Sequence, residues 1–179
     1  MTELRIVTAS QSDLEKMITL DHHVSSDHAY KLELNAGDEI IACRFQRVKL
    51  PRAVSLLYPR DQNSLMESWN KAKVIYVGMI LDQLVAYVTV ENDALPRTAR
   101  ICNLVVAPDV RRKGIGITML AACEGWATKQ KMNRVVIELP MRNDPAIRMA
   151  EKAGFELCGF LEQYFPNSDP ALFFSKRIG

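Results

Sequence analysis

RICNLVVAPDVRRKGIGITM, residues 100–119, is the stretch from which the rest of the chain can be placed. Apolar residues dominate 100–106 and are typical of a buried strand, which should end at Ala107-Pro108-Asp109. Apolar residues then recur at helical spacing, which predicts a helix over about 115–131. The order is therefore a strand, a basic loop that contains glycine, and a helix.

The loop 111–116 has the composition of an anion-binding site, with three cations and two glycines. At the start of a helix, free N–H groups and the positive end of the dipole face an incoming phosphate, and glycine lets the backbone come close. No Gly-Lys-Ser/Thr follows, and Met119 stands where a dinucleotide fingerprint has its third glycine, so neither nucleotide motif is present. The alternative is a solvated basic loop. The residues expected at the phosphate are Arg111, Arg112, Lys113, Gly114, Ile115, Gly116, Ile117 and Thr118.

Further elements follow on both sides of this stretch. Runs of alternating or continuous apolar residues predict strands over 4–7, 30–34, 40–48, 74–80, 84–90, 135–139, 155–161 and 171–176. Helices are expected over 10–20 and from Asn143 to Gly154, with Asp144 as the capping residue and Pro145 in the first turn. The polar segment 61–73 is expected to be a loop that contains at most a helical turn. These elements predict a single α/β domain that covers 1–179.

Composition excludes several classes of protein. Apolar residues make up 48% and charged residues 25%, and the net charge of +2 gives no global attraction to nucleic acid or to a membrane. No signal peptide or spanning segment is recognisable, so we expect a cytoplasmic protein. The four scattered cysteines should be reduced core thiols. His22, His23 and His28 lack a recognisable ligand partner, so no metal site is expected.

A resemblance to a known family rests on two motifs at its usual separation. Val106-Ala107-Pro108 followed by Arg111-x-x-Gly114-x-Gly116, and then Asn143-x-x-Ala146 with 151–155, Glu-Lys-Ala-Gly-Phe, resemble the GNAT acetyltransferases. The resemblance implies acetyl-CoA as co-substrate and a GNAT fold. That fold is a mixed twisted sheet of about six to seven strands, splayed at the fourth strand, with helices on both faces. The resemblance places the cofactor arm beside Leu104, Val105, Val106, Asn143, Ala146, Met149 and Lys152.

A weaker resemblance is to the streptothricin acetyltransferases. It rests on the hairpin over 27–54, on the run 143–147, and on 154–160, Gly-Phe-x-Leu-Cys-Gly-Phe. Those enzymes acylate a polycationic antibiotic. Residues 41–60 hold five cations and no acid, which would repel a polyamine and suit a neutral or anionic acceptor if this segment lines the acceptor site. The alternative is that these cations simply form a solvated strand face.

The side chains that this family commonly uses for catalysis are missing. Ala150 stands where a tyrosine commonly protonates the thiolate, and Val105 stands near the position of an acidic residue. Glu138 is a candidate for a base acting through water, or else an exposed strand carboxylate. Tyr164 is a candidate acid, or else ordinary aromatic packing. Asn103 is a candidate for orienting the acceptor.

The sequence therefore favours an acetyl-CoA-dependent N-acetyltransferase that transfers the acetyl group directly to a primary amine of a small molecule. Two alternatives stay open: a CoA-binding sensor or interaction module without catalysis, and a peptide or protein N-acetyltransferase. No nucleic-acid or membrane partner is expected, and a homodimer is left open.

Overall fold

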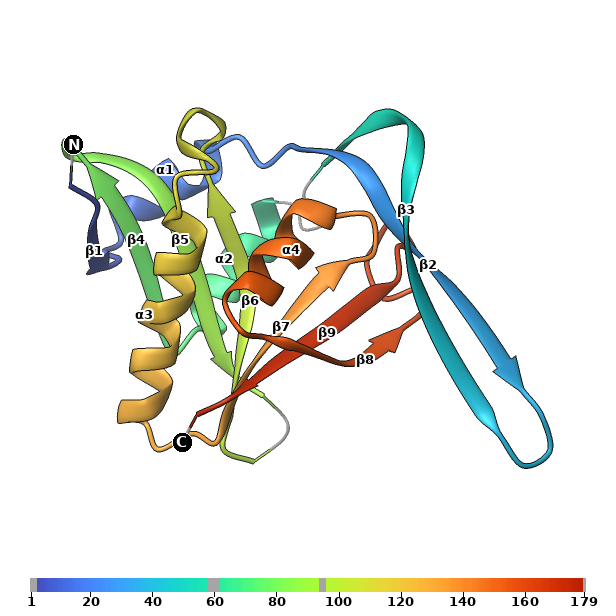
Figure 1. Cartoon of the computed structure of the whole chain (residues 1–179). Coiled ribbons are helices and arrows are strands. Elements are labelled where there is room, and N and C mark those ends of the chain that lie inside the picture. The colour runs from blue at the N-terminus through green and yellow to red at the C-terminus, as the bar shows by residue number, and fades with distance from the viewer. Residues whose placement is uncertain (1–2, 58–61, 94–95, 179) are drawn as a thin grey trace.

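The computed structural model describes residues 3–57, 62–93 and 96–178, which form a mixed α/β protein (Figure 1). The strands of the main sheet are β1 (Arg5–Thr8), β4 (Val74–Ile80), β5 (Gln83–Asn92), β6 (Thr98–Val106), β7 (Arg134–Pro140), β8 (Glu156–Leu161) and β9 (Ala171–Arg177). A separate hairpin consists of β2 (Val24–Ala36) and β3 (Ile41–Leu56). The helices are α1 (Asp13–Thr19), α2 (Gln62–Lys71), α3 (Ile115–Lys129) and α4 (Asp144–Lys152), with one 3-10 turn at Pro108–Val110.

The main sheet has seven strands in the order β1-β4-β5-β6-β7-β9-β8. Its neighbours are antiparallel except β6 and β7, which are parallel because α3 connects them as a crossover. This pairing joins only Thr98–Ile101 to Arg134–Ile137. The next residue, Cys102, is an extra residue that shifts the register of β6 against β5. Because a bulge bends its strand, β6 leaves β7 at this point, and the expected splay at the fourth strand of the sheet is confirmed.

Helices cover both faces of the sheet, as expected (Figure 1). On one face, α3 and α4 bury Met119, Cys123 and Ile147 in a cluster with the apolar side chains of β5, β6 and β7. On the other face, α1 and α2 bury Met17 and Leu65 in a cluster with β4, β5 and β6. In the described part of the chain, no helix is both long enough and apolar enough to cross a bilayer.

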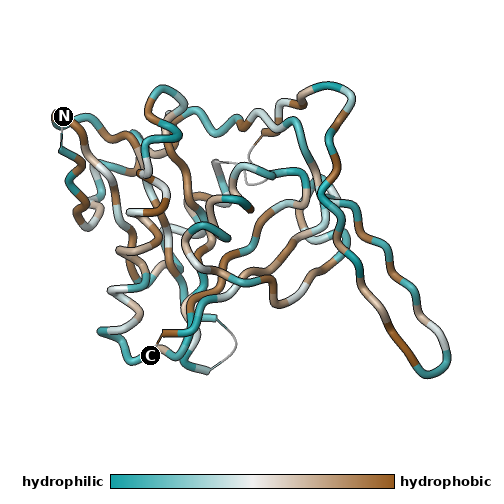
Figure 2. Tube along the Cα trace, viewed as in Figure 1, coloured by the Kyte–Doolittle hydropathy of each residue, from teal (hydrophilic) through white to brown (hydrophobic). Residues whose placement is uncertain are grey.

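The hairpin β2–β3 is longer than predicted and its far end extends away from the sheet (Figure 1). Its base is anchored, because the Tyr30 N–H donates to the Met141 carbonyl at 2.9 Å and Phe45 packs edge-on against Phe160 of β8. Figure 2 shows hydrophobic residues in the far half of the hairpin as well as along the sheet. Ile40 and Ile41 are exposed there.

The prediction of a loop over 61–73 is wrong, because Gln62–Lys71 forms α2. The segment has few apolar residues, but Leu65 and Trp69 are four apart and Ala72 follows three later, and all three pack against the same cluster. One apolar face against a sheet is enough to stabilise a helix whose sequence is mostly polar. Residue 61 lies outside the described residues.

Two local predictions are also wrong. The capping residue of α4 is Asn143, whose side chain accepts from the Ala146 N–H at 3.3 Å, whereas the Asp144 carboxylate binds Arg47. Cys102 and Cys123 are buried as expected, but Cys43 and Cys158 are exposed on strands. All four are free thiols. Burial raises the pKa of the Cys123 thiol to about 12, so this thiol stays protonated in the core.

Candidate active site

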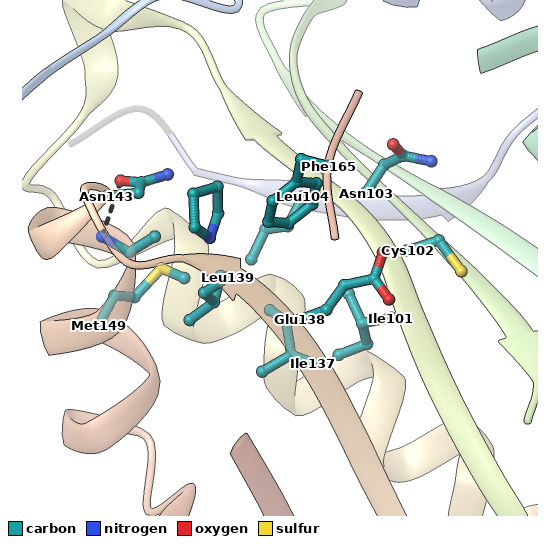
Figure 3. A pocket seen from close by; sticks show the side chains of 12 residues that line it. Ile101, Cys102, Asn103, Leu104, Ile137, Glu138, Leu139, Asn143, Met149 and Phe165 are labelled. Carbon is teal, nitrogen blue, oxygen red and sulfur yellow. Dashed lines mark hydrogen bonds between the residues drawn. The ribbon is translucent and has the colours of Figure 1, made fainter. Parts of the chain in front are cut away.

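The divergence of β6 from β7 creates an opening in the sheet with about 420 Å³ of empty space, part of it open to solvent. Figure 3 shows Glu138 extending from β7 towards β6, with Asn143 and Met149 at the α4 side of the opening. The residues that line it are Ile101, Cys102, Asn103, Leu104, Ile137, Glu138, Leu139, Pro140, Asn143, Ala146, Met149 and Phe165. The opening therefore brings Asn143 and Ala146 of the second motif close to Leu104, which the resemblance placed beside the cofactor arm.

The backbone of β6 presents polar groups to this opening. The Ala107 N–H donates to Val85 of β5 at 2.8 Å, and N–H and C=O groups alternate direction along a strand. The N–H and C=O groups of Leu104 and Val106 therefore point away from β5, into the opening between β6 and β7. The Val106 carbonyl does face away from β5, because it accepts from Arg111. An extended ligand in the opening can pair with β6 as a strand would.

The loop before α3 has the geometry of an anion cradle. Arg112 and Gly114 have positive φ angles of 66° and 86°, so successive N–H groups converge in a concave turn. Thr118 is the first residue of α3 with a helical bond, from its N–H to Gly114 O at 3.1 Å. The N–H groups of Ile115, Gly116 and Ile117 are therefore the free ones at the helix start. The exposed Arg112 and Lys113 add positive charge.

Arg111 has another role in this structure. Its Nε donates to the Val106 carbonyl at 2.7 Å, and its two terminal nitrogens donate to the carbonyls of His23 at 2.7 Å and Asp21 at 3.2 Å. Burial lowers the pKa of this guanidinium. All three nitrogens bind protein backbone, so the geometry gives no support to the prediction that Arg111 contacts phosphate directly. The Thr118 hydroxyl likewise donates to Gly114 O within the helix.

Helix α4 forms one wall of the opening. Ala146 and Met149 line it, whereas Lys152 is exposed in the last turn of α4 and does not. Gly116 of α3 lies so close to Met149 that a Cβ on Gly116 would overlap the methionine sulfur. This glycine therefore lets α3 and α4 meet next to the anion cradle, in addition to keeping the helix start accessible.

A buried polar cluster lies at the inner wall of the opening. Tyr164 Oη donates to Glu138 Oε2 at 2.6 Å. Arg100 approaches the same carboxylate oxygen at 3.6 Å and donates to Glu91 Oε2 at 3.1 Å. The Glu138 side chain is 1% exposed, so it is not the exposed strand carboxylate that the sequence left open. Tyr164 also packs edge-on against Phe165 and Phe173, so aromatic packing and a hydrogen bond to Glu138 coexist.

The other candidate side chains are held inside the protein. Asn103 is 1% exposed and its amide donates to Thr89 Oγ1 at 2.7 Å, while its residue still borders the opening. Val105 and Ala150, which the resemblance predicts at the family's usual catalytic positions, are buried in the two apolar clusters on opposite faces of the sheet. Neither can supply a proton or accept one.

Several residues near the site were not found from the sequence. Arg100 reaches both Glu91 and Glu138 only through the pairing of three strands, and Phe165 comes from the connection between β8 and β9. His22 contacts β5, because its Nε2 lies 2.8 Å from the hydroxyl of the buried Tyr87. No local sequence signal marks any of these contacts.

One group of acidic and imidazole ligands does form. Asp27, His28 and Asp144 bring one ligand atom each to within 4.8 Å of one another, a grouping that the sequence did not reveal. The Arg47 guanidinium binds both oxygens of Asp144. A cation is therefore already part of this group, and the contact ties the hairpin to α4.

The half-buried His22 gives a prediction about acid stability. Desolvation lowers its pKa below the ordinary value of 6.5. The unfolded chain therefore binds more protons than the folded one below that pH, so the free energy of unfolding should fall as pH falls. Urea unfolding at pH about 7.5 and about 5.5 should show a larger loss for the wild type than for His22→Gln. Equal losses in both proteins would contradict this assignment.

Comparison with known proteins gives the family. Residues 39–155 match the acetyltransferase (GNAT) family. A relative of known sequence is the L-amino acid N-acetyltransferase AaaT of Escherichia coli, 26% identical over 94 residues. That match covers 49% of this chain and 56% of the relative, so it spans little more than half of the relative's length. The chain belongs to the acetyltransferase (GNAT) family.

Solved structures share the fold over the full chain. A nourseothricin acetyltransferase superposes with a TM-score of 0.84 at 20% identity, covering 99% of this chain and 100% of its own. A protein of Bacillus anthracis described as a streptothricin acetyltransferase, in complex with acetyl coenzyme A, gives 0.79 at 19% identity, with 99% of each chain covered. The GNAT fold expected from the two motifs is confirmed, and the resemblance to streptothricin acetyltransferases holds at the level of fold.

Proposed function

We propose that the protein is an acetyl-CoA-dependent N-acetyltransferase that acetylates a primary amine of a small molecule by direct attack. The observation that carries the proposal is the position of the Glu138–Tyr164 pair. Glu138 lines the opening between β6 and β7, and Met149, which also lines it, lies against Gly116 of the anion cradle before α3. This arrangement supports a phosphorylated donor together with proton transfer at the Glu138–Tyr164 pair.

The residues present fit acetyl-CoA. The N–H groups of Ile115, Gly116 and Ile117, with the cations Arg112 and Lys113, would hold the pyrophosphate. The backbone of Leu104 and Val106 would pair with the pantetheine arm along the open edge of β6. The Val106 N–H would then polarise the thioester carbonyl. Asn143, Ala146 and Met149 would form the wall beside the arm.

Glu138 and Tyr164 together supply a complete proton path. An ammonium acceptor first loses one proton to solvent, and Glu138 takes the next proton from the neutral amine as the C–N bond forms. Tyr164 gives its proton to the sulfur as the C–S bond breaks. The proton on Glu138 then returns to the tyrosine oxygen along their 2.6 Å hydrogen bond. One proton has moved from amine to thiol, and both side chains are restored without a covalent enzyme intermediate.

The charge of the inner wall supports an amine acceptor. The carboxyl groups of Glu91 and Glu138 both lie beside the guanidinium of Arg100, and an acidic wall of this kind favours the approach of an ammonium group. The cations of β3 do not stand in the way of a cationic acceptor, because no residue of β3 lines the opening. Arg47 is paired with Asp144, and position 60 lies outside the described residues.

Tyr164→Phe provides a test of the acid. A thiol with a pKa of about 8.5 can leave as the thiolate even when no acid protonates the sulfur. We therefore expect kcat for thiol release to fall only about 10-fold, less than the 10²–10⁴ that positioned proton transfer can give. The measurement is CoA thiol release with acetyl-CoA and a panel of small amines. Tyr76→Phe, the same change on β4 at a residue that does not line the opening, is the control, and an unchanged kcat in Tyr164→Phe would remove Tyr164 from the mechanism.

A second candidate function is a CoA-binding sensor or interaction module. The burial of Val105 and Ala150 at the family's usual catalytic positions favours it. A peptide or protein acceptor is the remaining alternative. Thermal stabilisation by CoA together with no thiol release for any amine or peptide would support the sensor, whereas release with peptides alone would identify a peptide acetylase.

A further inference from the structure

Arg111 connects two segments that are far apart in the sequence. Its side chain leaves the loop before α3 and reaches the connection between α1 and β2, where it binds the carbonyls of Asp21 and His23. On the way it binds the carbonyl of Val106, the last residue of β6. Each of the three guanidinium nitrogens thus donates to one carbonyl, which replaces hydrogen bonds that these nitrogens would make with water.

The connection at 21–23 is itself shaped to receive this side chain. The Asp21 carboxylate accepts from the His23 N–H at 2.9 Å, which forms a tight turn. The turn directs the carbonyls of Asp21 and His23 to Arg111, while the side chain of His22 reaches Tyr87 on β5. The segment is thus fixed at two points, one on β5 and one on the cofactor loop.

This segment leads directly into the hairpin at the rim of the opening. β2 begins at Val24, and its Tyr30 N–H binds Met141, which directly follows β7. Tyr87 is paired with Val105, next to the two β6 residues whose backbone faces the opening. Movement of 21–23 would therefore displace the base of the hairpin relative to the end of β6.

We propose that Arg111 is a positioning residue for acetyl transfer that holds the segment 21–23, which leads into the hairpin, in place relative to the cofactor loop. Through Val106 it holds the end of β6, and through Asp21 and His23 it holds the start of the hairpin that is anchored at Met141. This inference rests on the proposed function. It differs from a phosphate-binding role, which would concern the donor alone.

Two acetyl donors distinguish a positioning role of Arg111 from a phosphate-binding role. Acetyl-CoA carries the pyrophosphate and S-acetylpantetheine lacks it. A positioning role predicts that Arg111→Gln lowers kcat/KM about 10- to 100-fold with either donor, because small misplacements at the reacting centre are costly. Lys113→Gln, a matched change of a neighbouring exposed cation, should matter with acetyl-CoA only. A loss in Arg111→Gln that disappears with S-acetylpantetheine would show phosphate binding and overturn the proposal.

A second measurement does not depend on turnover. Hydrogen exchange of the peptide that covers 20–24 should be faster in Arg111→Gln than in the wild type, and CoA should slow it in the wild type but not in the variant. Arg111→Lys keeps the charge but lacks the planar fork whose three separate nitrogens reach the three carbonyls, so it should behave as Arg111→Gln. Unchanged exchange in folded variants would overturn the proposal. If exchange responds as expected and no amine is acetylated, the proposed function fails and the coupling stands.

Discussion

Glu138→Gln should lower kcat for amine acetylation by about 10²- to 10⁴-fold, the range that positioned proton transfer supplies. An amine with a pKa near about 10.4 is almost entirely protonated at pH 7, so the reaction depends on a base. Glutamine keeps the size of the side chain and can still accept from Tyr164 Oη. The loss should therefore appear in kcat, while CoA binding and the unfolding temperature change little.

The pH dependence distinguishes a lost base from a disturbed site. In Glu138→Gln the rate should rise steadily with pH, as solvent takes over the deprotonation of the amine. Glu156→Gln is the control, because Glu156 is exposed on the edge strand β8. If Glu138→Gln retained wild-type kcat at neutral pH, or lost it with no recovery at high pH, the assignment of Glu138 as base would be wrong.

Replacing both Arg112 and Lys113 by glutamate should weaken CoA binding by about 100-fold, the second largest effect that we expect. Their charge lies at the helix start, where a phosphate and the positive end of the helix dipole would meet. Neither side chain is part of the core, so the fold should be kept. Calorimetric titration with CoA measures the change, and the loss should shrink as salt is added, because exposed charges are screened.

The same chain offers a matched control for this charge reversal. Lys129 and Lys131 are exposed at the other end of α3, and replacing both by glutamate changes the net charge equally. This control should bind CoA as the wild type does. An equal loss in both double variants would show that net charge alone matters and that the loop before α3 has no special role.

Much of the fold follows from local sequence signals. The edges of β6 and α3 are marked by Pro108 and by the glycines of the loop, and the central hairpin by its apolar runs. The limits of α4 are marked by residues with local conformational roles. Asn143 caps the helix start, Pro145 has a fixed φ in the first turn, and Gly154 takes a left-handed φ of 84° after the helix end. Each of these signals acts within a few residues, which is why the sequence alone could show them.

The parts that were missed depend on tertiary contacts. Helix α2 has weak periodicity and forms because Leu65 meets the sheet. Arg111 belongs to the phosphate motif in the sequence, but its guanidinium donates to the carbonyls of Asp21 and His23. Glu138 lies on β7 and Tyr164 on the connection after β8, and no local sequence pattern predicts that these two segments meet.

The measurement that tests the central claim most directly is amine-dependent release of CoA, followed together with mass detection of the acetylated product. The wild type with acetyl-CoA and a panel of small primary amines should release CoA only when an acceptor is present, and each CoA should be matched by one acetylated amine. Glu138→Gln should bind CoA and release almost none. Tight CoA binding by the wild type without release for any amine would contradict the account.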